Sequence, residues 1–449
     1  MSRRPPISRF FANVGLILSL YAVVTSAQTP PSPSIKVNVR EVLVPVVVTD
    51  KSGHYVTDLT AADFQVLEDG TPQKIVAFRN NVAPGSMPAA EAPQHAPARP
   101  PNVAASAPDA QAATLNASPK RTFLICVDTL HSAFDSFARV RTALKKLFEE
   151  EQPGDSQYAL ISLGWAPHVI VDSTRDPQTI LNAIGSKAFL KTIQDSEAAN
   201  IASSIHQFVE LMRAYCSACA CGPVSTDGPK CSLYRGQVQL FLLSYAERAS
   251  TQNQNFLSQL NRLISAIASM PTSRTVVFLS DGFNRFPGQE LEGILKGFEV
   301  RDRSFRFNPR DLQPQLDEVL RHAVRYDVRF YTLDSRGLYT SPDIPGTGED
   351  ASFGSPPPPS LVRESMFVAN ENGDAMAELA RETGGLFFEN TNDLLKGIRR
   401  AFADGREGYT LAYIPTNTLM DGKFRKITVE AKGQKLHVAS KTGYWATPQ

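Results

Sequence analysis

Two short apolar runs, each followed by an aspartate, constrain what this chain can fold into more than any other feature. Phe123–Val127 ends at Asp128, and Thr275–Leu279 is followed at once by Ser280 and Asp281. Continuous apolar runs of this length are typical of central strands that are buried on both faces of a parallel sheet. Open parallel sheets bind ligands at the carboxyl ends of their strands, so we expect the two aspartates to face one crevice.

Strand-like and helix-like patterns alternate around these two runs, from residue 120 to residue 403. Phe134–Glu151 places its apolar residues on one helical face, and Asp311–Tyr326 predicts a helix before the strand Val328–Leu333. This alternation predicts an α/β domain with a doubly wound, mostly parallel sheet. Two insertions, at 214–234 and 341–364, interrupt the pattern.

Segments rich in β-branched residues flank this domain, at 35–80 and at 404–447. Each contains several short strand-like runs separated by turn residues, and each is too small to form a stable sheet by itself. We therefore expect the two segments to pair into one small β-sandwich, with the α/β domain inserted between its halves. Residues 82–119 are rich in Ala and Pro and are predicted to be a linker, because they cannot bury enough apolar surface to fold.

The length of the chain indicates how many domains it forms, and its net charge bears on which partners it can bind. A chain of 449 residues is expected to form more than one domain. Its formal net charge of +1 and the lack of a long basic run argue against nucleic acid as a partner. Function therefore has to be inferred from individual sites.

The N-terminus has the pattern of a secretory signal. Arginines precede an apolar stretch, Val14–Val24, and small residues follow it up to Ala27. We expect removal of residues 1–27, a mature chain that begins near Gln28, and a periplasmic or extracellular location. A permanent N-terminal anchor is the alternative. No later segment is apolar over a length that would span a membrane, so the mature chain is expected to have no membrane span.

Four of the five cysteines lie in the first insertion, and two interpretations of them remain open. Cys216, Cys219, Cys221 and Cys231 are disulfide candidates, because clustered cysteines in an exported protein form disulfides more often than metal sites. Thiolates at this spacing could instead surround one zinc ion. The fifth, Cys126, lies inside a buried strand and is predicted to be a core residue.

Taken in order, these features resemble a known family. The buried strand ending in Asp128, the helix after it and the later Phe278–Gly282 segment resemble the von Willebrand factor type A domain. The flanks are similar to bacterial exported proteins called VWFA-related, which are abundant in acidobacteria. The motifs that carry this likeness are V-P-V-V-V-T-D at Val44–Asp50, A-D-F-Q-V-L-E-D-G at Ala62–Gly70, F-Y-T-L-D-S-R-G-L at Phe330–Leu338, E-T-G-G at Glu382–Gly385, Y-T-L-A-Y at Tyr409–Tyr413 and T-G-Y at Thr442–Tyr444.

The resemblance implies a metal-ion-dependent adhesion site, in which Mg2+ is held by Asp, two Ser, a Thr and a second Asp. Its pattern is Asp-x-Ser-x-Ser, and here Asp128 and Ser132 match while Leu130 replaces the first serine. Asp281 matches the second aspartate, and Thr192 lies roughly where the threonine is expected. Water could fill the position that Leu130 vacates. The alternative is a site without metal, whose aspartates cap a helix or face solvent.

Catalysis is not expected. His131 and Ser132 are adjacent in one loop, and adjacent residues seldom adopt the geometry of a base and its nucleophile. The chain has no Gly-x-Ser-x-Gly elbow, and Arg336-Gly337 and Gly384-Gly385 lack the spacing of phosphate loops and are predicted to be turns. His131 is predicted to be a surface residue.

The sequence thus predicts an exported, non-enzymatic binding or adhesion protein. It would bind a protein or cell-surface ligand at the crevice formed by Asp128, Ser132 and Asp281. Two other functions remain open. One is a structural or envelope-assembly component that uses its β-segments and binds no metal, and the other is a zinc-dependent activity at the cysteine cluster.

Overall fold

The computed structural model describes residues 41–81, 121–151, 156–193, 198–219, 228–270, 273–298, 300, 305, 309–338, 372–433 and 436–447. The chain divides into two compact units, 1–39 and 40–449, and every described residue belongs to the second. The predicted signal peptide at 1–27, the predicted linker at 82–119 and the predicted insertion at 341–364 lie outside the described residues.

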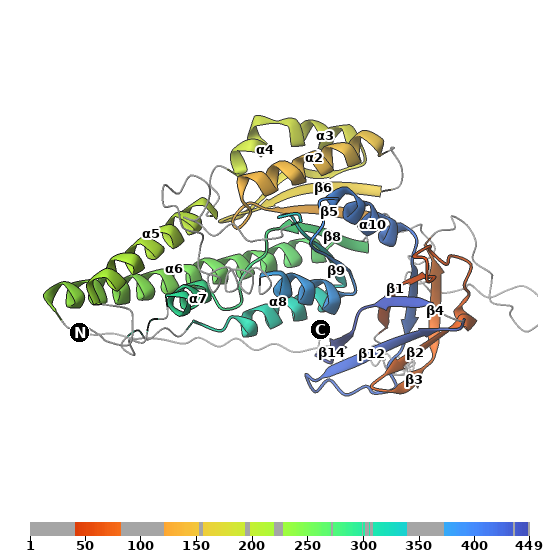
Figure 1. Cartoon of the computed structure of the whole chain (residues 1–449). Helices are drawn as coiled ribbons and strands as arrows, with labels where there is room; N and C mark the ends of the chain where they lie inside the picture. Colours follow the sequence, from red (N-terminus) through yellow and green to blue (C-terminus); the bar gives the residue numbers. More distant parts are fainter. Residues whose placement is uncertain are drawn as a thin grey trace, which may run out of the picture. The chain divides into compact units, whose positions relative to one another are not determined.

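A six-stranded sheet forms the centre of the α/β part, in the order β10-β9-β8-β5-β6-β7 (Figure 1). Its strands are β5 (Arg121–Asp128), β6 (Ser156–Leu163), β7 (Pro167–Thr174), β8 (Ser273–Ser280), β9 (Val328–Asp334) and β10 (Phe387–Phe388). All neighbours pair in parallel except β7, which is antiparallel to β6. The mostly parallel sheet is as predicted, and β5 and β8, which carry the two apolar runs, are neighbours within it.

Side chains along β5 point alternately to the two faces of the sheet, and both faces are apolar. Helices therefore cover both faces and form a separate core on each. Phe123, Ile125 and Val127 pack with one group of helices, whereas Leu124 and Cys126 pack with another. The first group is α2 (Phe134–Glu150), α3 (Pro177–Gly185), α4 (Lys187–Thr192) and α10 (Leu394–Arg406), and the second includes α6 (Pro229–Ala268) and α8 (Gln313–Arg325). Figure 1 shows α2 and α3 on one side of the sheet and α6 and α8 on the other.

Strands from the two ends of the chain share two antiparallel sheets, in the orders β13-β1-β11-β4 and β14-β12-β2-β3. The early strands are β1 (Val42–Thr49), β2 (Phe64–Glu68), β3 (Thr71–Gln73) and β4 (Ile75–Asn80), and the late strands are β11 (Tyr409–Tyr413), β12 (Phe424–Ala431), β13 (His437–Ser440) and β14 (Gly443–Trp445). Their inward side chains form one core, in which the ring of Tyr409 packs against Phe64 and Phe78. Each set of strands therefore completes the sheets of the other.

A long helical hairpin replaces much of the predicted insertion at 214–234. Helix α5 (Ala198–Cys219) continues beyond its expected end, and α6 already begins at Pro229. Proline at the first helical position has a suitable φ and lacks the N–H that would have no partner there, which accounts for the early start of α6. The hairpin has its own apolar core, shared with α7 (Gln289–Gly297). Among the helices of the described residues, none has the length and apolarity needed to cross a bilayer.

Candidate functional site

The carboxyl ends of β5, β8 and β9 meet at one edge of the parallel sheet, which we call the rim. Leu279 of β8 lies opposite Val127, and Ser280 lies opposite Asp334 of β9. Because parallel strands all end at the same edge, Asp128 and Asp281 come to neighbouring positions there. The rim thus brings together residues that are more than one hundred positions apart in the sequence, as the two apolar runs predict.

The carboxylate of Asp128 is fully buried at this rim and accepts hydrogen bonds at both oxygens. Its Oδ1 accepts the backbone N–H groups of Leu130, at 2.9 Å, and His131, at 3.0 Å. Its Oδ2 accepts the hydroxyl of Ser280 at 2.6 Å and lies 2.9 Å from Nδ1 of His131. Four protein donors therefore surround one carboxylate, which compensates for its removal from water.

The side chain of His131 is only 8% exposed and joins the rim to helix α6, so its prediction as a surface residue is wrong. Its Nε2 lies 2.8 Å from Oδ1 of Asn253, whose amide donates in turn to the carbonyl of Asn284. Both ring nitrogens thus face acceptor oxygens, which a doubly protonated imidazole satisfies. Burial is the largest influence on the pKa of His131 and lowers it, but the charge and hydrogen bond of Asp128 outweigh burial and raise the pKa overall.

Asp281 is held in a second group of hydrogen bonds beside the first. Its Oδ2 accepts the backbone N–H of Ala133 at 2.9 Å, and its Oδ1 accepts the hydroxyl of Ser335 at 2.7 Å. Burial raises the pKa of Asp281, and these hydrogen bonds lower it only in part. The loop between β5 and α2 is therefore fixed at one end by Asp128 and at the other by Asp281.

The remaining predicted ligands take different positions. Ser132 is buried between His131 and Ala133, and so lies on the loop that links the two aspartates. Leu130, which replaces the first serine of the pattern, is 1% exposed and packs in the apolar core that contains Phe256 and Phe283. The hydroxyl of Thr192 donates to the carbonyl of Phe189 within its own helical turn.

Mg2+ requires about six oxygen ligands in octahedral geometry, and the donors at the rim supply few free oxygens. The oxygens of Asp128 and Asp281 already accept bonds from protein donors, and Leu130 supplies no oxygen. Within the described ranges, no group of three His, Cys, Asp or Glu residues is arranged to hold a metal. The arrangement as described does not fit Mg2+ unless the loop that carries His131 and Ala133 moves, and the metal site stays a prediction.

The serines and the histidine at the rim have structural partners. His131 directs its two ring nitrogens at Asp128 and Asn253, so neither is available to activate Ser132. The hydroxyl of Ser280 donates to Asp128 and accepts the N–H of Gly282. These contacts hold the strand ends in place, and a catalytic role for them is not supported by geometry.

One ion pair and a set of arginine hydrogen bonds at the rim were not predicted from the sequence. Asp334, which is fully buried, pairs with Arg336 at 2.6 Å. Arg139 of α2 donates to the carbonyl of Ser335 and to the hydroxyl of Ser136. The only available signal was that Asp334 ends a third apolar strand, as Asp128 and Asp281 follow the other two.

Large apolar side chains that face solvent follow three of the strands that end at this edge. Phe134, at the start of α2, is 69% exposed, Trp165, just after β6, is 51% exposed, and Leu338, after β9, is 55% exposed. Each follows a strand that ends at the rim. Exposed aromatic and apolar groups that gather around one edge are typical of surfaces that bind proteins.

The three described cysteines of the first insertion are disulfide-bonded, in agreement with the disulfide interpretation. Cys219 and Cys231 form a disulfide between α5 and α6, and Cys216 is also disulfide-bonded. Cys221 lies outside the described residues. A zinc site would need several thiolates, so the described cysteines do not fit zinc. Cys126 is a free, fully buried thiol, as predicted, and burial raises its pKa.

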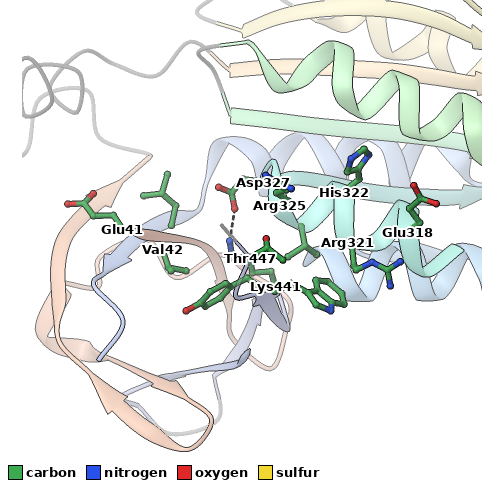
Figure 2. Close-up of a pocket in the computed structure, with 13 residues that line it drawn as sticks. Glu41, Val42, Glu318, Arg321, His322, Arg325, Asp327, Lys441 and Thr447 are labelled. Carbon is green, nitrogen blue, oxygen red and sulfur yellow. Dashed lines mark hydrogen bonds and ion pairs between the residues drawn. The ribbon is translucent and has the colours of Figure 1, made fainter. Parts of the chain in front are cut away.

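A pocket of about 250 Å³ lies where the β-sandwich meets helix α8 (Figure 2). Figure 2 shows Lys441 beneath Asp327, with Arg321 and Arg325 on α8 nearby, and the two charges of Lys441 and Asp327 are 2.5 Å apart. Strand β13 pairs with β1 only from Val46 onward. Among the described strands, the stretch Val42–Pro45 of β1 is therefore paired on one side alone, by β11, and it borders this pocket.

Comparisons with known proteins give distant structural likenesses only. No family model and no curated protein match the chain. An aerotolerance-related membrane protein from Bacteroides fragilis is 11% identical, with a TM-score of 0.30, over 63% of this chain and 98% of that one. The pilus adhesin SpaC from Lactobacillus rhamnosus is 10% identical, with a TM-score of 0.30, over 73% of this chain and 44% of that one.

The manganese-loaded TRAP protein from Plasmodium vivax is 9% identical, with a TM-score of 0.26, over 72% of this chain and 94% of that one. Scores and identities this low do not place the chain in a family.

Proposed function

We propose that this protein is exported and binds a protein or cell-surface ligand at the rim, without catalysis. The observation that carries this proposal is that three exposed apolar side chains, Phe134, Trp165 and Leu338, each follow a strand that ends at the rim beside a closed polar centre. Interfaces are enriched in aromatic residues, because these bury a large area for little loss of side-chain freedom. The disulfides support an oxidising compartment outside the cytoplasm.

The fixed loop at the rim supports binding rather than chemistry. Hydrogen bonds to Asp128 and Asp281 hold the residues from Leu130 to Ala133 in one conformation, and Phe134 follows directly. A ligand would therefore meet a surface that is already ordered, which lowers the entropic cost of association. We propose accordingly that the contact is made by apolar surface and does not require Mg2+.

We also propose that the α/β part is of the von Willebrand factor type A kind, inserted in the β-sandwich. Two observations support this. The parallel sheet has helices on both faces, and its two strand-end aspartates meet at the rim. The chain leaves the sandwich after β4 and returns to it at β11, the neighbour of β4.

Site-specific photocrosslinking tests the binding surface. A photoreactive phenylalanine analogue would replace Trp165 in the exporting cell, and the same analogue at Leu419, 66% exposed on the sandwich, would serve as the control. We expect adducts with another macromolecule at position 165 and none at position 419. Adding Phe134→Ala should reduce the adducts, because the two side chains would share one contact surface.

An assembly role is the second candidate, and the half-paired stretch Val42–Pro45 of β1 favours it. An exposed strand edge beside a pocket can accept an added strand from another chain. The same analogue placed at Leu43, which is 36% exposed, would then crosslink while position 165 would not. Adducts at Leu43 alone would overturn the rim proposal in favour of assembly.

A further inference from the structure

The outer face of helix α6 is unusual for a surface helix because it carries no charge over several turns. From Ser232 to Ser244 its exposed residues are serine, leucine, glycine and glutamine. Leu233 is 59% exposed, Leu240 is 69% exposed and Leu243 is 57% exposed. A helix that faces water normally carries charged side chains on its solvent side, so this face has the composition of a covered one.

This apolar face is additional to the face that α6 already buries. Val238, Leu242 and Tyr245 are at most 3% exposed and pack against α5 in the core of the hairpin. The three exposed leucines lie at spacings of seven and three residues, which places them in one stripe along the opposite side. We call residues 233, 236, 240 and 243 the α6 stripe. Within the part of the chain that the structure describes, its leucines are exposed.

We propose that the α6 stripe pairs with the same stripe of a second copy, in an antiparallel arrangement about a two-fold axis near Val238. In that register Leu233 packs on Leu243 of the second copy, and Leu240 packs on Gly236 of the second copy. Because the axis is two-fold, the same two contacts form again with the copies exchanged. The stripe is thus complementary to itself in this one register.

Gly236 provides the hole that this register needs. A Cβ added at Gly236 would meet no heavy atom within 4 Å, so the position is open to the outside. Glycine disfavours a helix interior, and its absent side chain leaves room for a knob from a facing helix. The side chain of Leu240, the most exposed of the three leucines, would fill that hole.

The charges at the two ends of the stripe favour the same register. Lys230 and Glu247 are both exposed and lie beyond the two ends of the stripe, whereas the neighbouring Arg248 donates a hydrogen bond to the hydroxyl of Ser204 on α5. With the axis near Val238, Lys230 of one copy comes within about one residue of Glu247 of the other, at both ends of the contact. A parallel pairing would place like charges together instead, and opposite charges at helix edges set the orientation of paired helices.

The size of the contact predicts a weak dimer. From Leu233 to Glu247 the helix rises by about 21 Å, at about 1.5 Å per residue. A single pair of helices over that length buries less than the roughly 800 Å² per partner of a standard stable interface. The disulfide between Cys219 and Cys231 holds α5 and α6 together at this end, which limits the ordering cost. We therefore expect a dimer that dissociates on dilution.

Sedimentation equilibrium over a range of concentrations tests the proposal on the protein from Gln28 onward, the predicted mature form. We expect a monomer–dimer equilibrium for the wild type, and a dissociation constant raised at least about tenfold by Leu240→Glu. Leu419→Glu is the matched control, since Leu419 is a similarly exposed leucine at 66% on the sandwich, and it should leave the equilibrium unchanged.

The Gly236→Leu variant distinguishes register-specific dimerisation from non-specific hydrophobic association. It adds apolar surface and improves helix propensity, so a sticky patch would associate more strongly. Pairing through the hole predicts the opposite result, weaker association, because the site for Leu240 is filled. Lys230→Glu and Glu247→Lys should each weaken the dimer, and the double variant should restore it.

Three results would overturn the proposal. They are a wild type that stays monomeric at the highest concentration, a dimer that is indifferent to Leu240→Glu, and a dimer that Gly236→Leu strengthens. A monomer whose binding to phosphatidylcholine vesicles is lost in Leu240→Glu would also overturn it and assign the stripe to a lipid surface.

Discussion

Two aspartates in this chain make the same local arrangement in opposite environments. Asp50 accepts the backbone N–H groups of Ser52 and His54 at one oxygen and faces the His54 ring at the other. Asp128 does the same with Leu130 and His131. The His54 side chain is 81% exposed, whereas that of His131 is 8% exposed. The two sites therefore place a similar aspartate–histidine contact in water and in the interior, although Asp128 also accepts the Ser280 hydroxyl.

Replacing His131 with alanine should lower the free energy of unfolding by about 3 kcal/mol, because it leaves a buried carboxylate without one of its partners. His54→Ala removes the same contact in water, where exposed ion pairs contribute little, and should change the free energy of unfolding hardly at all. Urea denaturation of both variants measures the difference. Equal effects would mean that the His131 contact with Asp128 does not stabilise the rim.

Glu290 should make stability depend on pH. It accepts the hydroxyl of Tyr245 at 2.5 Å, and burial raises its pKa above the usual 4.5. The folded state keeps this proton over a pH range in which the unfolded state has lost it, so the free energy of unfolding falls as pH rises through that range. The loss amounts to about 1.4 kcal/mol per unit of pKa shift.

Glu290→Gln keeps an acceptor for Tyr245 but has no proton to lose. Thermal unfolding between pH 4 and pH 8 should therefore show a smaller decrease of stability for the variant than for the wild type. Parallel curves for the two proteins would contradict the raised pKa of Glu290.

At the residue scale, the sequence reveals aspartates more readily than their partners. Asp128 and Asp281 follow apolar runs and could be placed at the rim from that alone. Asn253 could not, because it contacts His131 across 122 positions and lies in a helix whose pattern gives no sign of the rim. The burial of His131 depends on that contact, so its position could not be predicted either.

At the scale of elements, the short strand β10 depends on a glycine next to it. A Cβ on Gly385 would lie 1.9 Å from the carbonyl oxygen of Phe330 in β9. Gly385→Ala should therefore separate β10 from β9 and lower the free energy of unfolding by about 3 kcal/mol or more, since backbone cannot rotate away as a side chain can. Gly185→Ala at the end of α3 is the control, because its Cβ meets nothing within 4 Å. Chemical denaturation should show little or no destabilisation there.

The positions of helices and strands could be predicted where the hydrophobic periodicity and the turn residues agree. The exact residues at which helices begin and end could not. Asp176 and Pro177 mark the start of α3, and the structure places Asp176 at its N-cap. The ends of α5 and the start of α6 were misjudged, since cysteine, alanine and proline near Cys219 and Pro229 look like a loop by composition. Packing between the two helices, which no local pattern shows, stabilises these turns.

At the scale of the whole molecule, an ion pair is among the contacts that connect the sandwich to the α/β part. Lys441, with a side chain 7% exposed, contacts Asp327 at the end of α8. Lys441→Ala should lower the free energy of unfolding by about 1–3 kcal/mol, since a partly buried charge loses its hydrogen-bonded partner. Lys423→Ala, whose side chain is 76% exposed and 3.8 Å from Asp421, is the control and should have little effect. Differential scanning calorimetry measures both, and equal melting temperatures would contradict the prediction.

The pairing of early and late strands could be predicted because each end segment of the sequence is too small to form a stable sheet by itself. Neither end segment contains enough strands for a stable sheet, and the structure pairs β1 with β11 and β2 with β12. The register of those pairs could not be predicted, because it depends on which side chains face the shared core. The ion pair of Lys441 with Asp327 likewise joins residues that only the assembled fold brings together.

The closeness of the two connections to the sandwich determines how the molecule would respond to tension. The chain leaves the sheet at Asn80 and re-enters it at Tyr409, and these residues are paired neighbours on β4 and β11. If the sandwich is held and a ligand pulls on the rim, the force acts on adjacent strand ends. Strands pulled from the same end separate one hydrogen bond at a time, in contrast to sheared strands, which must break all their bonds together. The contact of Lys441 with Asp327 is one of several across this seam, together with the hydrogen bonds of Tyr55 with Asp404 and of Thr442 with Glu382. Once these are broken, the protein would open at the seam while the rim and its ligand stay intact.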